Sequence, residues 1–165
     1  MNHRIAAWLW VVFFVFSAPV VADGAGARFG TGVQALVSKH DRALSTQDLG
    51  GVLDTFMADA VLMGTGPGEL WVGADAIKDA YQHFFADYDA GSMNVDCTWR
   101  STGGNDRLAW LTAMCWLTDY LKNEKRQFAI NLSAVAEKQG DEWRFRWFHF
   151  SNVTAPEQQQ DRVVP

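Results

Sequence analysis

The second half of the chain constrains the fold most, because it predicts four long strands joined by three short loops. β-Branched and aromatic residues dominate four segments, 93–101, 107–121, 126–137 and 142–152. The loops between them are rich in Gly, Asn and charged residues, which is typical of β-hairpins. Strands joined in this way form an antiparallel meander, and such a sheet has to bury at least one of its faces.

The residues before the meander predict the helices that cover it. Apolar residues recur at helical spacing in three segments, 29–44, 45–60 and 74–88. We expect Ser45 or Thr46 to cap the second helix. Two short strands, 61–65 and 69–72, are expected around the turn signal Pro67-Gly68. The predicted fold is therefore α+β: a cone or half-barrel of strongly bent antiparallel sheet, packed on three N-terminal helices and enclosing a cavity.

The first 22 residues have the three-part pattern of a cleaved signal peptide. An apolar run from Ile5 to Phe16 follows Arg4, and small residues precede Asp23. At about 1.5 Å per residue the run spans about 18 Å, whereas the apolar core of a bilayer measures about 30 Å, which argues against a membrane anchor. Cleavage before Asp23 predicts a periplasmic or secreted protein that is not attached to a membrane.

Composition divides the rest of the chain into three parts. A flexible segment rich in Gly and Ala is expected at 23–28, one domain at 29–154, and a disordered tail with Gln, Pro and charged residues at 155–165. The net charge of −5 and the absence of a Lys/Arg run argue against nucleic-acid binding. No His/Cys cluster has the spacing of a zinc site, so neither a metal nor a cofactor is predicted.

The two cysteines lie on the first two predicted strands of the meander. A turn centred on Gly104 would place Cys97 opposite Leu111 and leave Cys115 about 14 Å further along the strand, beyond the reach of about 7 Å between the Cα atoms of a disulfide. A bulge, or a turn centred on Asp106, would align them. We expect the first register, and hence two free, buried thiols despite the oxidising compartment.

Three stretches resemble the SnoaL-like branch of the nuclear transport factor 2-like (ketosteroid-isomerase-like) superfamily. They are ALSTQDLGGVLDTFMADAVL at 43–62, MGTGPGELWVGADAIKDAY at 63–81 and WRFRWFHFSN at 143–152. The resemblance covers about 29–154 and implies the same conical α+β fold. It also implies a homodimer, because relatives commonly pair through the open face of the sheet. Function does not follow, since this fold hosts isomerases, cyclases, dehydratases, binding proteins and association domains.

The resemblance can be compared residue by residue with the steroid isomerases of the superfamily. Their catalytic Tyr corresponds to His40, their Asp general base to Gly64, and their second, hydrogen-bonding Asp to a position near Ser133. All three identities differ in this chain. Because a Gly accepts no proton, the comparison argues against that isomerisation and leaves a pocket without the known catalytic groups.

Two histidines are the first candidates for a site. His40 lies in the apolar stripe of the first predicted helix, where it serves either as a general base or ligand donor in the cavity, or as a neutral core side chain satisfied by one backbone carbonyl. His149 lies on the last strand, where it either anchors a ligand near the mouth or holds the strand end to a loop. No spacing among these residues suggests a metal site.

Alternation along the last strand predicts which side chains face the cavity. Trp147, His149 and Ser151 share the odd face with the other aromatic residues of that strand, so we expect this face to line the cavity. On the neighbouring strand Asn131 and Ser133 share one face, where they bond each other and His149 or bind a ligand. Phe148 and Phe150 are expected on the opposite, outer face, as a contact patch for a second copy.

Three further residues are candidates for the wall and rim of the cavity. Trp71 is expected to form part of the wall, packed against Gly64, which faces it across the short hairpin and leaves room for the indole. Trp99 on the sheet is a second wall candidate, with a core or interface position as the alternative. Glu69 is either a carboxylate at the rim or a solvated turn residue.

The leading functional prediction is an exported domain that binds a small apolar or aromatic-ring molecule in an aromatic-lined cavity. It is preferred because aromatic residues are abundant while the catalytic carboxylates of the isomerases are missing. One alternative is an acid–base enzyme of the isomerase, cyclase or lyase type that uses His40 or His149. Another is a structural dimerisation domain.

Overall fold

The computed structural model describes residues 25–153 of the chain, with side chains from 30 onward except at 99 and 100. The predicted leader 1–22 and the predicted tail 155–165 lie outside the described residues. The elements are α1 (Ala25–Thr46), α2 (Leu49–Leu53), β1 (Phe56–Met63), β2 (Leu70–Val72), α3 (Ala74–Phe85), β3 (Asn94–Gly104), β4 (Leu108–Leu121), β5 (Glu124–Gln139) and β6 (Glu142–Asn152). The predicted order of helices and strands is confirmed, and α1 begins four residues before the predicted Phe29.

The strands form one six-stranded sheet in the order β2-β1-β6-β5-β4-β3. The meander β3 to β6 is antiparallel throughout, as predicted. The sheet as a whole is mixed, because β1 pairs with β6 in parallel. The prediction of an antiparallel sheet is therefore wrong for the pairing of β1 with β6. A parallel pair needs a long connection, and the intervening α3 and β3–β5 supply it.

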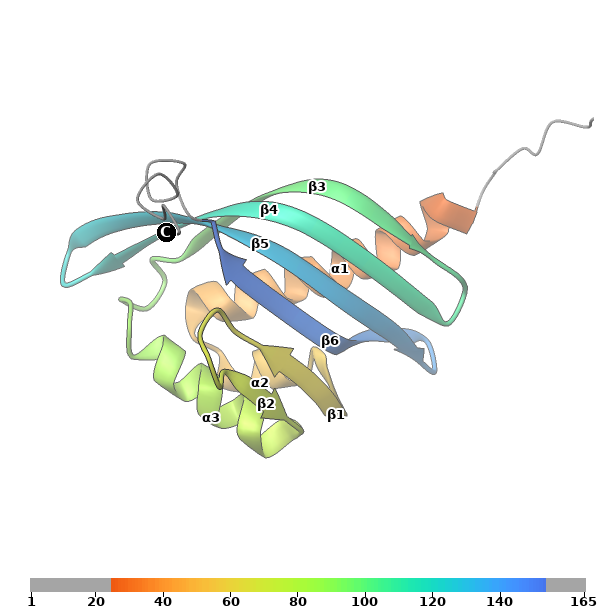
Figure 1. Ribbon diagram of the computed structural model, residues 1–165, viewed down its shortest axis with the longest axis horizontal. Helices are drawn as coiled ribbons and strands as arrows, with labels where there is room; N and C mark the ends of the chain where they lie inside the picture. Colours follow the sequence, from red (N-terminus) through yellow and green to blue (C-terminus); the bar gives the residue numbers. More distant parts are fainter. Residues whose placement is uncertain (1–24, 154–165) are drawn as a thin grey trace, which may run out of the picture.

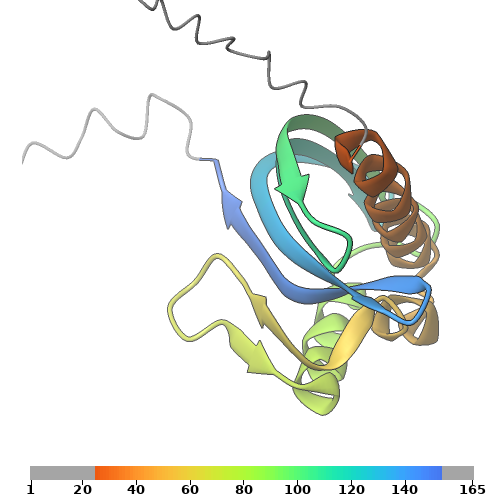
Figure 2. The ribbon, with the colours of Figure 1, turned by 90° about the vertical axis from the view of Figure 1, so that its right-hand side faces the viewer.

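The sheet curls around α1, so the core lies on its concave face. Figures 1 and 2 show β3 to β6 arching over α1, with α3 beside the short hairpin of β1 and β2. One side of α1 buries Val33, Leu36, Val37 and Leu44, and these residues belong to the same apolar cluster as the inward side chains of β4, β5 and β6. Helices on one face of a curled sheet give the predicted α+β cone, open at one end.

The second helix is shorter than predicted. It ends at Leu53, and Phe56 begins β1 instead of extending the helix. Asp48 caps its first turn by accepting a hydrogen bond of 2.9 Å from the Gly51 amide, so neither Ser45 nor Thr46 is the N-cap. Two consecutive glycines, at 50 and 51, weaken the helix and fit its single turn.

A bulge in β6 reverses the alternation of its side chains. Ala136 of β5 pairs with Phe145, whereas the adjacent Val135 pairs with Trp147, so β6 carries one extra residue at this point. As a result Phe145 and Phe148 both point into the core, where each is at most 5% exposed. Beyond the bulge the even residues of β6 face inward. The prediction that the odd face lines the cavity along the whole strand is therefore wrong.

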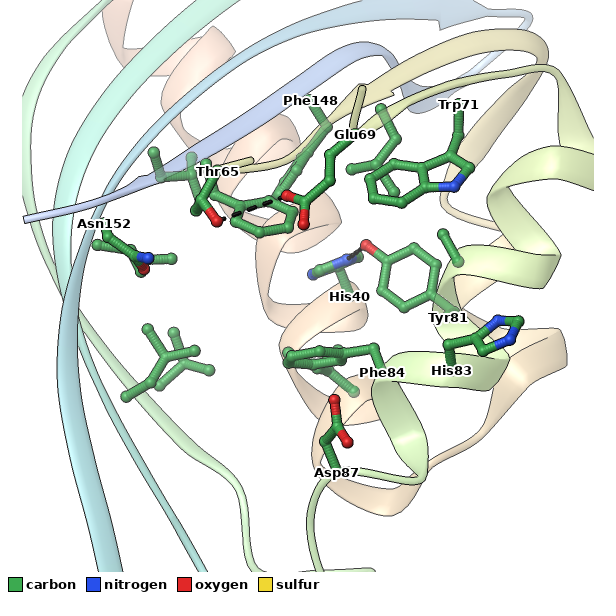
Figure 3. A pocket seen from close by; sticks show the side chains of 18 of the residues that line it. His40, Thr65, Glu69, Trp71, Tyr81, His83, Phe84, Asp87, Phe148 and Asn152 are labelled. Atoms are coloured by element: carbon green, nitrogen blue, oxygen red, sulfur yellow. Dashed lines mark hydrogen bonds between the residues drawn. The ribbon is translucent and has the colours of Figure 1, made fainter. Parts of the chain in front are cut away.

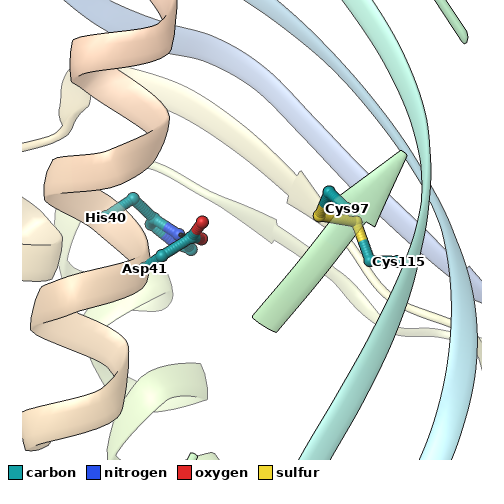
Figure 4. The surroundings of a disulfide bond; sticks show 4 residues. All are labelled: His40, Asp41, Cys97 and Cys115. Carbon is teal, nitrogen blue, oxygen red and sulfur yellow. Dashed lines mark ion pairs between the residues drawn. A yellow bond between two sulfur atoms is a disulfide. The ribbon is translucent and has the colours of Figure 1, made fainter. Parts of the chain in front are cut away.

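Cys97 and Cys115 form a disulfide bond between β3 and β4 (Figure 4). They are direct register partners, so the prediction of two free thiols is wrong. The pairing Gly104–Ala109 moves the turn toward Asp106, and a register shift between Trp99 and Ser101 adds a bulge. Asn105 stabilises this turn, because its side-chain oxygen accepts hydrogen bonds of 3.0 Å from the amides of the second and third residues after it.

Candidate functional site

A pocket of about 380 Å³ opens between α1, α3, the β1–β2 hairpin and the concave face of β4 to β6 (Figure 3). Most of its lining is apolar or aromatic: Leu44, Leu62, Trp71, Ala80, Phe84, Val95, Leu117, Phe128, Ile130, Leu132, Phe148 and Phe150. The polar side chains of the lining are His40, Asp41, Thr65, Glu69, Tyr81, His83, Asp87 and Asn152. The volume and the apolar lining with a few polar groups are typical of small-molecule sites.

His40 lies in the interior of the pocket, paired with a tyrosine from α3. The apolar spacing of α1 turns His40 toward the sheet, where it is 4% exposed. Its Nε2 lies 2.7 Å from the hydroxyl oxygen of Tyr81. Its Nδ1 lies 3.5 Å from the carboxylate of Asp41. The carboxylate favours a proton on Nδ1, so that Nε2 accepts the hydrogen bond that Tyr81 donates.

Tyr81 holds its proton firmly. Burial raises the pKa of its phenol far above the ordinary value, and the negative charge of Asp41 raises it further. The three side chains therefore form a row in which the carboxylate of the half-buried Asp41 lies beside Nδ1 of His40, and Nε2 of His40 is hydrogen-bonded to Tyr81. This row can present a hydroxyl oxygen to a molecule in the pocket, and it can relay a proton.

Aromatic rings enclose His40 on several sides. The ring centroid of His40 lies 5.9 Å from that of Phe56, 5.7 Å from that of Phe145 and 5.0 Å from that of Phe148. Phe145 and Phe148 come from β6 on either side of its bulge, so the bulge itself builds this aromatic enclosure. The enclosure keeps water away from His40 and fixes the orientation of its ring.

Glu69 occupies the space that a side chain at position 64 would fill. A Cβ atom on Gly64 would lie 2.3 Å from Oε2 of Glu69 and 2.9 Å from its Cβ. The same Oε2 accepts a hydrogen bond of 2.7 Å from the Gly66 amide. The prediction that Gly64 leaves room for Trp71 is thus wrong, because Trp71 pairs with Leu62 and Glu69 lies opposite Gly64. A carboxylate from the facing side of the hairpin thus lies beside the bare backbone of Gly64.

The predicted site residues separate into two groups. His40, Glu69 and Trp71 line the pocket. Trp147, His149 and Ser151 face the opposite side of the sheet, because the bulge in β6 places Phe148 and Phe150 inward instead. Asn131 and Ser133 of β5 face that same outer side, since they alternate with the inward Ile130 and Leu132. The expectation that both histidines share one cavity is therefore wrong. The side chain of Trp99 lies outside the described ones.

On the outer face of the sheet, the predicted polar neighbours do meet. His149 and Ser133 are register partners, and Nδ1 of His149 lies 3.2 Å from the Ser133 hydroxyl. This contact agrees with the alternative in which the polar pair bonds His149. The outer face also exposes Trp110 and Trp116.

Sequence reasoning missed Tyr81, Phe84 and Asp41 as site residues. Tyr81 and Phe84 belong to the apolar side of α3, a pattern that a core residue and a pocket residue share. Asp41 follows His40 on α1 and is half-buried at the edge of the pocket. The sequence offered one signal for the pair of Asp41 and His40: an acidic residue directly after a histidine on the apolar side of a helix.

Two further structural findings concern metals and membranes. Across residues 25–153, no three His, Cys, Asp or Glu side chains come close enough together to hold a metal ion. Of the helices within that same range, none has the length and apolar character needed to cross a bilayer.

Solved structures of other proteins share the fold of this chain. They include a nuclear transport factor 2-like protein of unknown function from Pseudomonas putida, with 14% identity and a TM-score of 0.69 over 86% of this chain and 100% of that one. A protein of unknown function from Mycobacterium tuberculosis has 15% identity and a TM-score of 0.71 over 90% and 83%. A ketosteroid isomerase-like protein from Erwinia carotovora has 17% identity and a TM-score of 0.63 over 76% and 96%. The fold is thus that of the nuclear transport factor 2-like superfamily.

The family follows from the sequence itself. Residues 33–156 match the SnoaL-like domain, and the chain belongs to this family. No curated protein matches the sequence. At these identities the solved structures establish the fold alone, so the function has to be argued from the pocket.

Proposed function

We propose that this protein is exported and binds a small apolar molecule, with an aromatic ring system, in the pocket beside His40. The observation that carries the proposal is the open cavity of about 380 Å³ with a mostly apolar and aromatic lining and one buried polar pair, His40 and Tyr81. Burial of the ring system supplies affinity, and the His40–Tyr81 pair supplies a polar anchor that fixes orientation.

The test uses naphthylethanol, a neutral two-ring probe with one hydroxyl group. Calorimetry on the mature protein is expected to show saturable binding at one site per chain. Ala80→Leu adds bulk to the pocket wall from α3 and is expected to weaken binding about tenfold or more, a loss of about 1.4 kcal/mol. Ala35→Leu is the matched control, since it makes the same change at an exposed position of α1. Equal binding by both variants, or none by the wild type, would contradict the proposal.

Export is supported by the disulfide, because such bonds persist in oxidising compartments. The intact mass of the soluble protein from the native host is expected to correspond to a chain beginning at Asp23. Full-length chain in the membrane fraction would contradict export.

Pairing of two copies through the outer sheet face forms part of the same proposal. Its support is the exposure of Trp110 and Trp116 on that face, since the predicted patch of Phe148 and Phe150 lines the pocket instead. Light scattering is expected to give twice the mature mass, and a monomer at tens of micromolar would contradict pairing.

A second candidate, acid–base catalysis, is favoured by the row Asp41–His40–Tyr81. Its test is exchange of the protons beside the carbonyl of naphthylacetone in D₂O, followed by NMR. Exchange that the protein accelerates and that His40→Gln abolishes would support catalysis. Exchange at the rate in buffer, with the probe bound, would leave binding as the function and contradict catalysis.

A further inference from the structure

The charged side chains that line the pocket are mostly acidic. Its ionisable lining consists of three carboxylates, Asp41, Glu69 and Asp87, two histidines and the protonated phenol of Tyr81. Within the described part of the chain, no lysine or arginine lines this pocket. Charged groups around an apolar cavity select ligands by their charge more than by their shape. Opposite charges attract a ligand to the entrance, and like charges repel it.

Three arginines of β5 and β6 are engaged with acidic groups of their own. Arg126 donates two hydrogen bonds, of 2.7 and 2.8 Å, to the carboxylate of the buried Asp119. It also donates one to the backbone oxygen of Asp87. Arg144 and Arg146 form ion pairs outside the pocket, with Asp54, Glu142, Asp59 and Glu137. Among the ion pairs of the side chains that the structure describes, none involves Glu69.

The carboxylate of Glu69 is fixed in a position where it can bind a cation. The Gly66 amide fixes Oε2, and the bare backbone of Gly64 makes room for the carboxylate. Figure 3 shows this carboxylate directed toward the interior, on the part of the wall to which Trp71 and Phe148 also belong. Aromatic faces near a carboxylate suit an ammonium group, which gains from the charge and from the π-electrons together.

We propose that Glu69 determines the charge class of the ligand, and that the pocket takes an aromatic molecule carrying a basic amine. This inference rests on the proposed binding function. The ring system fills the apolar part of the pocket, and the ammonium group donates to Glu69. Asp41 and Asp87 add to the negative potential at the mouth, so an aromatic carboxylate of equal size is disfavoured.

The test compares three probes that share one ring system and a two-carbon side chain: naphthylethylamine, naphthylethanol and naphthylacetic acid. Calorimetry at pH 7 is expected to give an affinity for the amine about tenfold higher than for the alcohol, and for the acid about tenfold lower. Added salt is expected to narrow the gap between amine and alcohol, because it screens charges at the partly exposed mouth.

Two variants test the role of Glu69 from different directions. Glu69→Gln removes the charge, and Gly64→Ala displaces the carboxylate without removing it. Both are expected to bring amine and alcohol affinities within about twofold of each other. The matched controls are Glu124→Gln, an exposed acid on β5, and Gly30→Ala, where an added Cβ meets nothing within 4 Å. The controls are expected to keep the preference for the amine.

The outcomes separate this inference from the proposed function. If the alcohol binds and the amine is not preferred, or if Glu69→Gln keeps the preference, the assignment of Glu69 is wrong while the binding function stands. If the acid binds best, the charge class is wrong. If none of the three probes binds, the binding function and the inference fail together.

Discussion

Reduction of the disulfide is expected to remove a large part of the stability of this domain. The bond joins β3 to β4 at residues that are direct register partners, and Cys115 is fully buried. Reduction with a phosphine opens the bond but leaves both sulfur atoms in place. The change in unfolding free energy therefore reports the cross-link itself, without loss of packed atoms.

The magnitude follows from the length of the closed loop. For a sequence separation of 18, the loop-closure entropy removed from the unfolded chain amounts to about 3 kcal/mol at about 25 °C. Domains of this size are commonly stable by about 5–15 kcal/mol, so such a loss is readily measured. Urea unfolding followed by tryptophan fluorescence, with and without reductant, gives the difference.

The double variant Cys97→Ala/Cys115→Ala serves as the control, because its unfolding has to be insensitive to the reductant. A loss below about 1 kcal/mol on reduction would refute the entropy argument, since the hairpin would then restrict the unfolded chain without the bond. Two reactive thiols in the denatured, unreduced protein would refute the cross-link itself.

Two further predictions concern the buried pair and the acid side of the stability curve. Tyr81→Phe deprives Nε2 of His40 of its partner and is expected to lower the unfolding free energy by about 1–3 kcal/mol in urea titrations, whereas an unchanged value would show that the pair carries no stability. The hydrogen bond from Lys39, aided by Arg144, holds the pKa of Asp54 below its ordinary value of 3.8. A group whose pKa is lowered in the folded state stabilises the fold above its unfolded pKa. This stability is lost as the pH falls through the folded pKa. Acid unfolding is therefore expected to be less steep for Asp54→Asn below about pH 4. Because Asp54 is half-exposed, this difference is small, and identical acid titrations would contradict the ion pair.

The sequence predicted the elements of this fold well, because local periodicity decides them. The meander and the amphipathic α1 and α3 follow from side-chain spacing alone. The parallel pairing of β1 with β6 does not follow from local spacing, since Phe56 and its partner Phe145 are separated by 89 positions of sequence. Pairing over such a distance depends on how the sheet curls, which single segments do not encode.

The site was predicted in part, and the errors share one physical cause. Alternation along a strand holds only while the register is unbroken, and one extra residue near Arg146 exchanges the faces of β6. That single shift moved His149 to the outer face and Phe148 into the pocket. The same sensitivity applies to Cys97 and Cys115, which a bulge and a displaced turn bring together. His40 was identified because helical spacing tolerates no such shift.

The most direct test of the account locates the bound naphthylethanol by NMR, using protein labelled at its methyl groups. The account predicts intermolecular nuclear Overhauser effects to Leu117, Ile130 and Leu132, whose side chains line the pocket on the concave face. Val61 and Val135, both register partners of Trp147 on the outer face, are expected to give none. Nuclear Overhauser effects to these valines, with none to the residues of the concave face, would contradict the account. The molecule would then bind on the outer face and not in the pocket that His40 lines.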